Sequence, residues 1–170
     1  YSDLPLGLRV LRRLENIIRE EMNAAGANEV LLPVLQPIDL WKQTGRDQTM
    51  KEVMIRFEDK RGREMCLGPT HEEVITDLVK SFVQSYRQLP VVLYQIQSKF
   101  RDETRTRFGI VRACEFIMKD AYCFYRYKAG MQKNYQLLYD VYNKIFKRCG
   151  LPVIVVEADS GAMGGDVSHE

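Results

Sequence analysis

Two segments on either side of a charged loop carry residues that could bind a nucleotide. The run Phe100-Arg-Asp-Glu103 places Arg101 and Glu103 two residues apart, so both side chains share one face if the segment is a strand. An arginine there offers a planar fork of donors to phosphate oxygens, and a glutamate can accept from the amino group of a base. Phe116 on the returning segment offers a ring for stacking. The F-R-x-E pattern by itself is also typical of a charged surface hairpin.

The segment Gly68-Pro-Thr-His-Glu-Glu73 opens a predicted helix. Thr70 and Glu73 have the spacing of a capping box, in which each side chain bonds the backbone of the other residue. That arrangement leaves Glu72 unexplained. A carboxylate in the first turn is favoured by the helix dipole, but Glu72 could also be the ion-pair partner of a ligand ammonium, with Thr70 as an acceptor. The local sequence leaves both interpretations open.

The C-terminal segment contains Gly161-Ala-Met-Gly-Gly165, followed by Ser168-His-Glu170. Paired glycines let the backbone approach a ligand closely, and an ordinary turn would use the same residues. Neither GxxxxGK[ST] nor GxSxG occurs in the chain, which excludes P-loop enzymes and hydrolases built on a nucleophile elbow.

The composition is that of a globular domain. Of its 170 residues, 45% are hydrophobic and 28% are charged, and the net charge is +2. This near balance of charge does not by itself indicate a nucleic-acid-binding protein. Its longest apolar run is too short to span a bilayer, and we expect no membrane partner. The four cysteines and two histidines lack metal-ligand spacing, and no metal ligand is predicted. The first residue is Tyr1 rather than Met, so we expect that the true start precedes it.

The elements that must position these residues follow from periodicity and breakers. Helices are predicted over 6–25, 37–41, 70–83 and 128–149, the last with an aromatic stripe expected to pack in the core. Strands are predicted over 29–33, 53–57, 64–67, 91–103, 110–124 and 153–157, with 91–103 and 110–124 as an antiparallel pair around the loop 104–109. Irregular alternation of helices and antiparallel hairpins indicates one α+β domain.

The whole chain resembles a known family. Residues 4–11, with the helix after them and the strand ending at Pro33, resemble motif 1 of class II aminoacyl-tRNA synthetases. Residues 67–76 are similar to the amino-acid segment of bacterial-type prolyl-tRNA synthetases, 86–124 to their motif 2, and 157–170 to the segment that follows. The resemblance implies a class II synthetase-like antiparallel sheet flanked by helices, with 1–170 as a single partial catalytic domain. Motif 3, an editing domain and an anticodon-binding domain are absent from these residues.

The resemblance also implies an activity: ATP-dependent activation of proline to prolyl-adenylate and transfer of proline to tRNA(Pro), in a longer, cytoplasmic, homodimeric enzyme. Mg2+ would bridge the phosphates without a named protein ligand, and the 170 residues alone would be inactive. The implied roles cover catalysis and ATP binding, the proline pocket and the dimer interface. These roles fall on Arg101 and Glu103 as catalytic and ATP-binding residues, Arg112 and Phe116 for ATP, Thr70, Glu72 and His169 with nearby glycines for proline, and Pro33 for the interface.

One departure and two alternatives accompany the resemblance. Family members carry Arg-Gly-Arg-Glu-Phe where this chain has Arg112-Ala-Cys-Glu-Phe116. Cys114 therefore stands where the family has an arginine, and no role of that arginine can be assigned to this chain. One alternative is another class II synthetase, such as the threonyl or seryl enzyme, whose amino-acid segments differ. The other is a synthetase-like binding or regulatory module that has lost catalysis, which the missing motif 3 favours and the intact Thr70, Glu72, Arg101 and Glu103 oppose.

Overall fold

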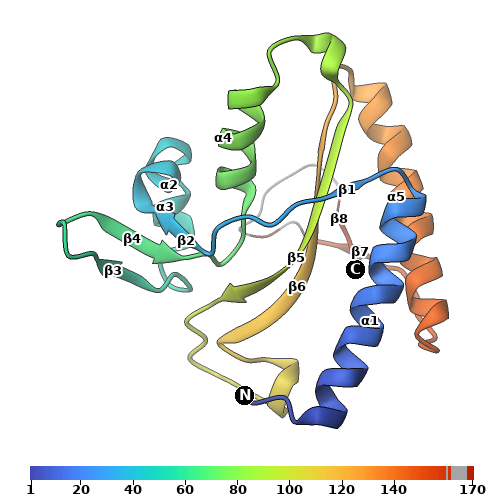
Figure 1. The fold of residues 1–170 in the computed structure, drawn as a ribbon, viewed down its shortest axis with the longest axis horizontal. Helices are drawn as coiled ribbons and strands as arrows, with labels where there is room; N and C mark the ends of the chain where they lie inside the picture. The colour runs from blue at the N-terminus through green and yellow to red at the C-terminus, as the bar shows by residue number, and fades with distance from the viewer. Residues whose placement is uncertain (160, 162–167) are drawn as a thin grey trace.

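The centre of the molecule is a three-stranded sheet in the order β1-β5-β6. The computed structural model describes residues 1–159, 161 and 168–170, and its architecture is α+β as predicted. β5 (Val91–Phe100) and β6 (Glu115–Phe124) are antiparallel, and β1 (Asn28–Glu29) runs parallel to β5. Figure 1 shows the long pair running from the top of the molecule to the bottom. This β5–β6 ribbon is the frame on which the other elements pack.

The ribbon has two faces of different character. Ten consecutive residue pairs join its strands, and directly opposite residues of an antiparallel pair point to the same side. Tyr94 and Ala121 therefore share one side, which we call the apolar face, and Gln95 and Asp120 share the other, which we call the polar face.

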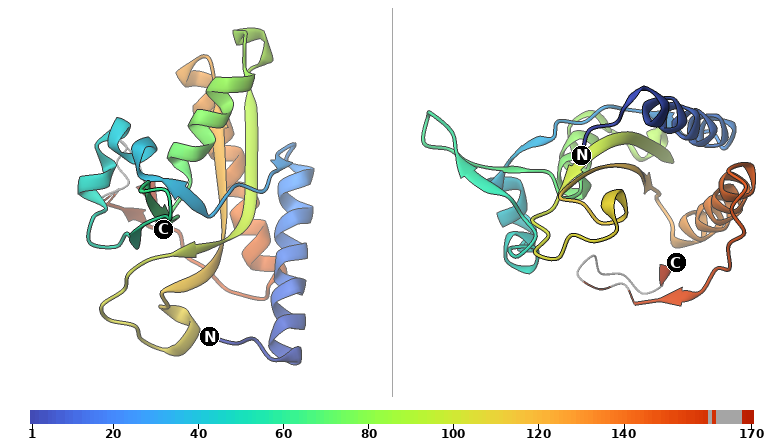
Figure 2. Two further views of the ribbon diagram at one scale, coloured as in Figure 1. Left: turned by 60° about the vertical axis from the view of Figure 1, so that its left-hand side comes forward. Right: turned by 90° about the horizontal axis from the view of Figure 1, so that it is seen from below.

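Two long helices cover the apolar face. α1 (Pro5–Ala24) and α5 (Lys128–Arg148) pack against each other there, as Figure 2 shows from below. The core between helices and ribbon consists of five buried residues, Met22, Ala27, Tyr94, Val141 and Ile145. Burying aliphatic and aromatic side chains in this way stabilises the fold by about 1.5–3 kcal/mol for each one fully buried.

The polar face is covered by different elements. α4 (Glu72–Phe82) lies over its upper half, where Ile75 and Val79 pack with Leu93. Beside it, β2 (Leu35–Pro37), β4 (Glu64–Leu67) and β3 (Arg56–Glu58) form a small antiparallel sheet, which α2 (Ile38–Thr44) and α3 (Arg46–Thr49) accompany. Trp41 on α2 is fully buried in the core of this second unit. The lower half of the polar face is left to residues 68–72.

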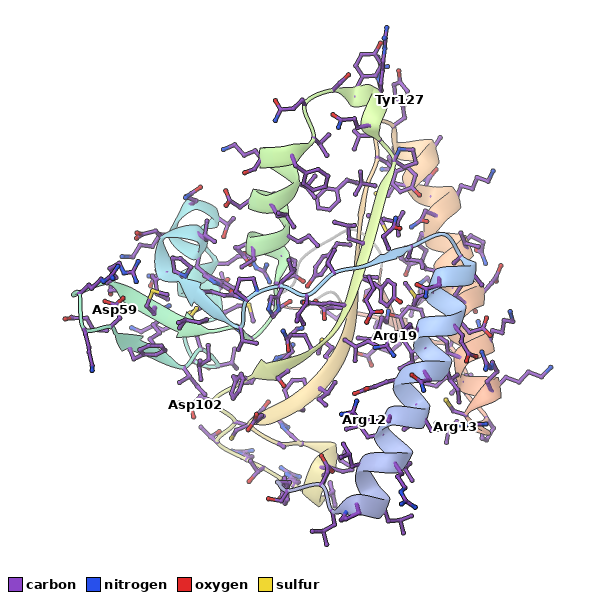
Figure 3. The ribbon with its side chains drawn as sticks, viewed as in Figure 1. Arg12, Arg13, Arg19, Asp59, Asp102 and Tyr127 are labelled. Atoms are coloured by element: carbon purple, nitrogen blue, oxygen red, sulfur yellow. The ribbon has the colours of Figure 1, made fainter. Side chains whose placement is uncertain are left out.

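The two ends of the ribbon connect to short elements. The 3-10 helix η1 (Tyr86–Gln88) precedes the upper end of β5, and η2 (Gly109–Val111) lies within the loop at the lower end. Figure 3 shows Asp102 at the lower end, where the chain leaves β5, and Tyr127 at the upper end. β7 (Glu157–Ala158) and β8 (Ser168–His169) pair with each other near the C-terminus.

Several predicted elements are confirmed and six need correction. The strand predicted over 53–57 is β3 at Arg56–Glu58. The first long strand ends at Phe100 rather than 103, and the Glu103 N–H donates to the Arg101 carbonyl in a turn. The strand predicted over 29–33 is reduced to β1, because residues 30–34 run on without regular pairing. The second long strand begins at Glu115 rather than 110, after η2. Residues 153–156 are not a buried strand, since the side chain of Ile154 is 88% exposed. The aromatic stripe of α5 reaches the core at Ile145, while Met131, Tyr135 and Tyr142 line an open cavity.

Candidate functional site

Residues 68–70 cross the lower half of the polar face. The backbone N–H of Phe100, at the end of β5, donates to the Gly68 carbonyl at 3.1 Å. The Gln36 amide donates to the Thr70 carbonyl at 3.1 Å. A Cβ on Gly68 would lie only 3.1 Å from Cδ of Gln36, which is closer than carbon atoms pack. Glycine is therefore favoured at this crossing, because a larger residue would displace the Gln36 side chain that bonds the Thr70 carbonyl. The crossing brings Thr70 next to the end of β5.

Thr70 and Glu72 form a hydrogen-bonded pair at this crossing. The Thr70 hydroxyl donates to Oε2 of Glu72 at 2.5 Å. Thr70 is buried, while about a third of the Glu72 side chain stays exposed (35%). The Glu72 carboxylate is therefore the part of the pair that solvent reaches, and the Thr70 hydroxyl holds it in place.

The predicted capping box is wrong. The N-cap residue of α4 is His71, and its side chain makes no capping hydrogen bond. Thr70 is occupied by Glu72 instead, and Glu73 lies 2.9 Å from Nη1 of Arg46 in a buried ion pair. The charge of Arg46 on α3 outweighs a local backbone bond, since charge-assisted hydrogen bonds are the stronger kind. The arrangement removes the capping explanation for Thr70 and leaves its hydroxyl directed at Glu72.

Arg101 lies directly beside this segment. Its backbone N–H donates to the Cys114 carbonyl at 2.9 Å, which continues the pairing of the ribbon by one step. Its Nε donates to the Pro69 carbonyl at 3.3 Å, and its guanidinium carbon lies 5.4 Å from the centre of the Phe116 ring. The backbone and the ring hold the guanidinium in place, and its terminal nitrogens remain the donors for a ligand.

Glu103 and Arg112 face each other across the base of the charged loop. Nη2 of Arg112 lies 2.7 Å from Oε2 of Glu103, and Nε donates to the same oxygen at 2.9 Å. The thiol of Cys114 contacts the Glu103 carbonyl at 3.8 Å. Glu103, Arg112 and Phe116 are thus at the same end of the ribbon as Arg101, as the sequence predicts, and the first two neutralise each other.

A buried polar cluster lies beneath Thr70 and Glu72. Nζ of Lys99, which is fully buried, lies 2.7 Å from Oδ1 of Asp120. Oδ2 of Asp120 accepts from the Gln95 amide at 2.9 Å and from the Tyr122 hydroxyl at 2.5 Å. The side-chain oxygen Oε1 of Gln95 accepts from the backbone N–H of Leu32 at 3.1 Å. One aspartate therefore collects three donors from the two strands of the ribbon.

Burial shifts the protonation equilibria of this cluster. Loss of hydration lowers the pKa of Lys99, and the adjacent Asp120 opposes that change. Burial also lowers the pKa of His71 to about 4, assisted by the charge of Lys99. His71 is therefore neutral at neutral pH. Its Nε2 lies 3.1 Å from the Pro33 carbonyl oxygen, so Nε2 carries the proton. The pKa of Tyr122 is raised by burial, with the charges of Glu72 and Asp120 adding to the effect.

His169 lies elsewhere in the described structure. Its Nδ1 is 2.7 Å from the Tyr135 hydroxyl, and its ring packs edge-on against Tyr139 at 6.0 Å between centroids. Both tyrosines belong to α5, on the apolar side of the ribbon, where they line a cavity of about 770 Å³. The structure does not bring His169 together with Thr70 and Glu72. The neighbouring Gly164 and Gly165 lie outside the described residues.

The charges of the site mostly cancel in pairs. Three ion pairs account for six groups: Lys99–Asp120, Arg46–Glu73 and Arg112–Glu103. Among the described residues, Glu72 makes a longer ion-pair contact, with Arg46 at 3.4 Å. Arg101 contacts a carbonyl and a ring rather than a carboxylate among the described residues. A ligand with a cationic nitrogen at one end and an anionic group at the other would complement Glu72 and Arg101 together.

The chain belongs to the family described as the tRNA synthetase class II core domain (G, H, P, S and T), which matches residues 55–169. Within that family it is similar to proline–tRNA ligases: it is 59% identical to that of Halothermothrix orenii over 170 residues and 57% identical to that of Nitratidesulfovibrio vulgaris. Each match covers 100% of this chain and 30% of the relative. The predicted resemblance is confirmed, and the chain spans less than a third of the length of these relatives.

Two solved structures share the fold. A threonyl-tRNA synthetase structure from Cryptosporidium parvum, described as its RNA binding domain, matches with a TM-score of 0.79 and 28% identity over 91% of this chain and 37% of its own. A Giardia lamblia prolyl-tRNA synthetase in complex with prolyl-adenylate matches with a TM-score of 0.80 and 21% identity over 85% of this chain and 30% of its own. The predicted class II synthetase architecture is confirmed.

The buried cluster was not predicted from the sequence. Gln95, Gln97 and Lys99 occupy every second position of β5, which places three polar side chains on a single face, and Arg101 follows at the next such position just beyond the strand. That alternation was the available signal. It marks the strand as one whose second face does not pack in an apolar core.

Proposed function

We propose that the protein carrying this chain activates proline with ATP and transfers it to tRNA(Pro). The observation that carries the proposal is the junction of residues 68–72 with the end of β5, which sets the Thr70–Glu72 pair beside Arg101. The relatives named proline–tRNA ligase support proline as the amino acid. Residues 1–170 would be one partial catalytic domain of that longer enzyme.

The proposed first step joins the two ends of the site. Glu72 and Thr70 hold the imino nitrogen of proline, which leaves its carboxylate directed at Arg101. A carboxylate oxygen attacks the α-phosphorus of ATP, a new P–O bond forms, and pyrophosphate leaves with its bond electrons. Arg101 opposes the negative charge that builds on the α-phosphate during in-line transfer, where positioning and electrostatics supply most of the acceleration.

The remaining nucleotide contacts come from the other residues at this end of the ribbon. Phe116 would stack on adenine, Glu103 would accept from its amino group, and Arg112 would reach the outer phosphates. Because Glu103 and Arg112 now pair with each other, ATP must exchange that ion pair for its own contacts. An exposed pair of this kind contributes only about 0–1 kcal/mol, so the exchange costs little.

Magnesium fits this site only through the nucleotide. Among the described residues, no group of three His, Cys, Asp or Glu side chains is placed to hold a metal ion. Mg2+ would therefore bind mainly to phosphate oxygens, as it commonly does with nucleotides, and would offset their charge when bound.

The placement of His169 in the proline pocket stays a prediction.

The second proposed step makes prolyl-tRNA. The terminal adenosine hydroxyl of tRNA(Pro) attacks the prolyl carbonyl, and AMP leaves. This step, like tRNA binding, needs the parts of the relatives that this chain does not span.

Homodimer formation is also proposed. Leu4, just before α1, and Leu6 and Val10 in its first half are exposed, and a partner would cover these apolar side chains. Pro33, the predicted interface residue, is exposed as well.

No helix in the described part of the chain is long and apolar enough to cross a membrane. We propose the cytoplasm as the location, because ATP, proline and tRNA are all available there for the two steps.

The test is amino-acid-dependent exchange of labelled pyrophosphate into ATP by the complete gene product. Exchange that depends on proline, and not on threonine or serine, is expected. Exchange with threonine would favour the threonyl alternative, to which the 28% identical structure gives some weight. A folded product that binds a non-hydrolysable prolyl-adenylate analogue without exchange would instead favour a binding module.

A further inference from the structure

The charges of the chain are unevenly distributed, and two long segments contain no acidic residue. Residues 78–98 and 121–139 have no Asp or Glu, but they contain five exposed cations, Lys80, Arg87, Arg126, Lys128 and Lys133. Subtracting their charge of +5 from the net charge of +2 leaves the rest of the chain at −3. Within the described part of the chain, none of the five cations forms an ion pair. A positive region without internal partners attracts an anionic one.

The fold gathers three of these cations at the upper end of the ribbon, where α4 ends and α5 begins, as Figure 1 shows. Lys80 on α4, Arg126 after β6 and Lys128 at the start of α5 line one open cavity of about 480 Å³. The strand β5 separates this end from Arg101 by about 30 Å, since a strand rises about 3.3 Å per residue. The upper end is therefore not part of the candidate site.

Two tyrosines hold Arg126 in a fixed orientation. Its guanidinium carbon lies 3.9 Å from the centre of the Tyr86 ring and 4.8 Å from the centre of the Tyr127 ring. The 3-10 helix η1, which carries Tyr86, is fixed in turn by a capping box between Ser85 and Gln88. A guanidinium that stacks on aromatic rings keeps its N–H edge available for a phosphate. That edge lies beside the cavity that the two lysines also line.

The chemistry of the upper end favours RNA over other anionic partners. An acidic peptide or a free phosphate would use the cations but would gain little from the tyrosines, whereas unpaired bases of RNA stack on aromatic rings. Tyr86 and Tyr127 are 54% and 64% exposed, so ring surface remains available beyond their contacts with Arg126. Phosphates that repeat along a strand also match cations that come from separate elements.

We propose that the upper end of the ribbon is a binding surface for tRNA(Pro). This upper-end patch consists of Lys80, Tyr86, Arg126, Tyr127 and Lys128. The arginine binds one phosphate through its N–H edge, the lysines neutralise neighbouring phosphates, and the tyrosines stack on unpaired bases. The identity of the RNA rests on the proposed function, and the patch adds a contact on this chain to those made by the rest of the protein. It takes no part in forming prolyl-adenylate.

The test measures the affinity of the complete gene product for a fluorescent tRNA(Pro) transcript, by anisotropy at several salt concentrations. The double variant Arg126→Gln/Lys128→Gln removes two cations of the patch. We expect it to weaken binding about tenfold and to reduce the slope of log affinity against log salt by about two, as loss of two phosphate contacts implies. The matched control, Arg61→Gln/Lys147→Gln, removes exposed cations from the β3–β4 turn and the lower end of α5, and should change neither quantity.

A third variant separates stacking from charge. Tyr127→Leu should weaken binding at every salt concentration and leave the slope unchanged, because losing a base contact releases no counterions. Proline-dependent pyrophosphate exchange should be unchanged in all three variants, since the first proposed step uses no tRNA.

Wild-type affinity and slope in Arg126→Gln/Lys128→Gln would overturn the upper-end patch. A change in the sedimentation of that variant would then assign these residues to a contact between two copies of the chain. Equal weakening by the control variant would also overturn the patch, because the effect would be one of net charge. A failure of the proposed function is distinguishable, since the wild-type protein would then show no proline-dependent exchange.

Discussion

The two faces of the β5–β6 ribbon are built on different principles. On the apolar face, Tyr94 and Ala121 pack with residues of α1 and α5 in an apolar core. On the polar face, Lys99 and Asp120 are buried as a pair in which each needs the other. We expect the first face to accept substitutions that conserve volume, and the second to accept only changes made to both partners together. The difference indicates that the apolar face stabilises the fold, while the polar face positions the residues of the candidate site.

The largest effect is expected where the pairing of the polar face is broken. Lys99→Met leaves Asp120 buried without its cation, and the free energy of unfolding should fall by about 3–5 kcal/mol. Adding Asp120→Asn removes the orphaned charge and should restore most of that loss. Urea unfolding of the complete gene product and its two variants measures both effects. A single variant as stable as the double would mean that the ion pair is not the dominant constraint on this face.

The apolar face provides the contrasting case. Ile145→Ala on α5 opens a cavity in the core beside Met22 and Tyr94, and the free energy of unfolding should fall by about 2–5 kcal/mol. The Michaelis constants for proline and ATP should not change at temperatures where the variant stays folded. A selective rise in the KM for proline would break the proposed division between the faces.

How far the sequence predicts each face follows from the same contrast. Helical periodicity predicts α1, α4 and α5 within a few residues, because burial of an apolar stripe is a local signal. The grouping of Arg101, Glu103, Arg112 and Phe116 at the lower end of the ribbon is predicted for a similar reason, since all four lie in or next to the loop that joins two consecutive strands. The capping box failed because Arg46, from a distant helix, takes Glu73. A partner that is remote in sequence leaves no local signal.

The buried cluster illustrates the same limit. Polar residues at every second position of β5 are visible in the sequence, but their partner is not. Asp120 lies 21 residues after Lys99, and only the register of the ribbon sets it within reach. His169 is the opposite case, because the resemblance assigns it to the proline pocket and the described structure places it against Tyr135.

A pH effect would sharpen the comparison without altering either core. The pKa of His71 is lowered by burial to about 4, whereas an unfolded histidine titrates near 6.5. Between these values the unfolded chain binds a proton that the folded chain does not, so stability falls as pH decreases, by up to about 3 kcal/mol. Lys99, Asp120 and Glu72 are the charged groups that act on the imidazole.

The measurement is the urea midpoint at about pH 7 and about pH 5, for the wild type and for His71→Gln. The variant should show a shallower loss of stability with acid, because glutamine does not titrate. Equal slopes for the two proteins would assign the acid sensitivity to other groups.

The smallest effect expected is the most specific. Glu72→Gln keeps the size of the side chain and removes the charge that the imino nitrogen of proline would meet. Affinity for proline should fall by about 1.5–3 kcal/mol, the contribution of one hydrogen bond to a charged group, while affinity for ATP and the urea midpoint stay as they are. Calorimetric titration with a prolyl-adenylate analogue and with ATP measures the two affinities separately.

The matched control is Glu73→Gln, one residue on, whose carboxylate is buried and pairs with Arg46. That variant should lose stability before it loses affinity, because its carboxylate supports the helix and is not offered to a ligand. If Glu72→Gln instead weakened ATP as much as proline, the carboxylate would be acting on the whole site, and the assignment of one end to the amino acid and the other to the phosphate would be wrong.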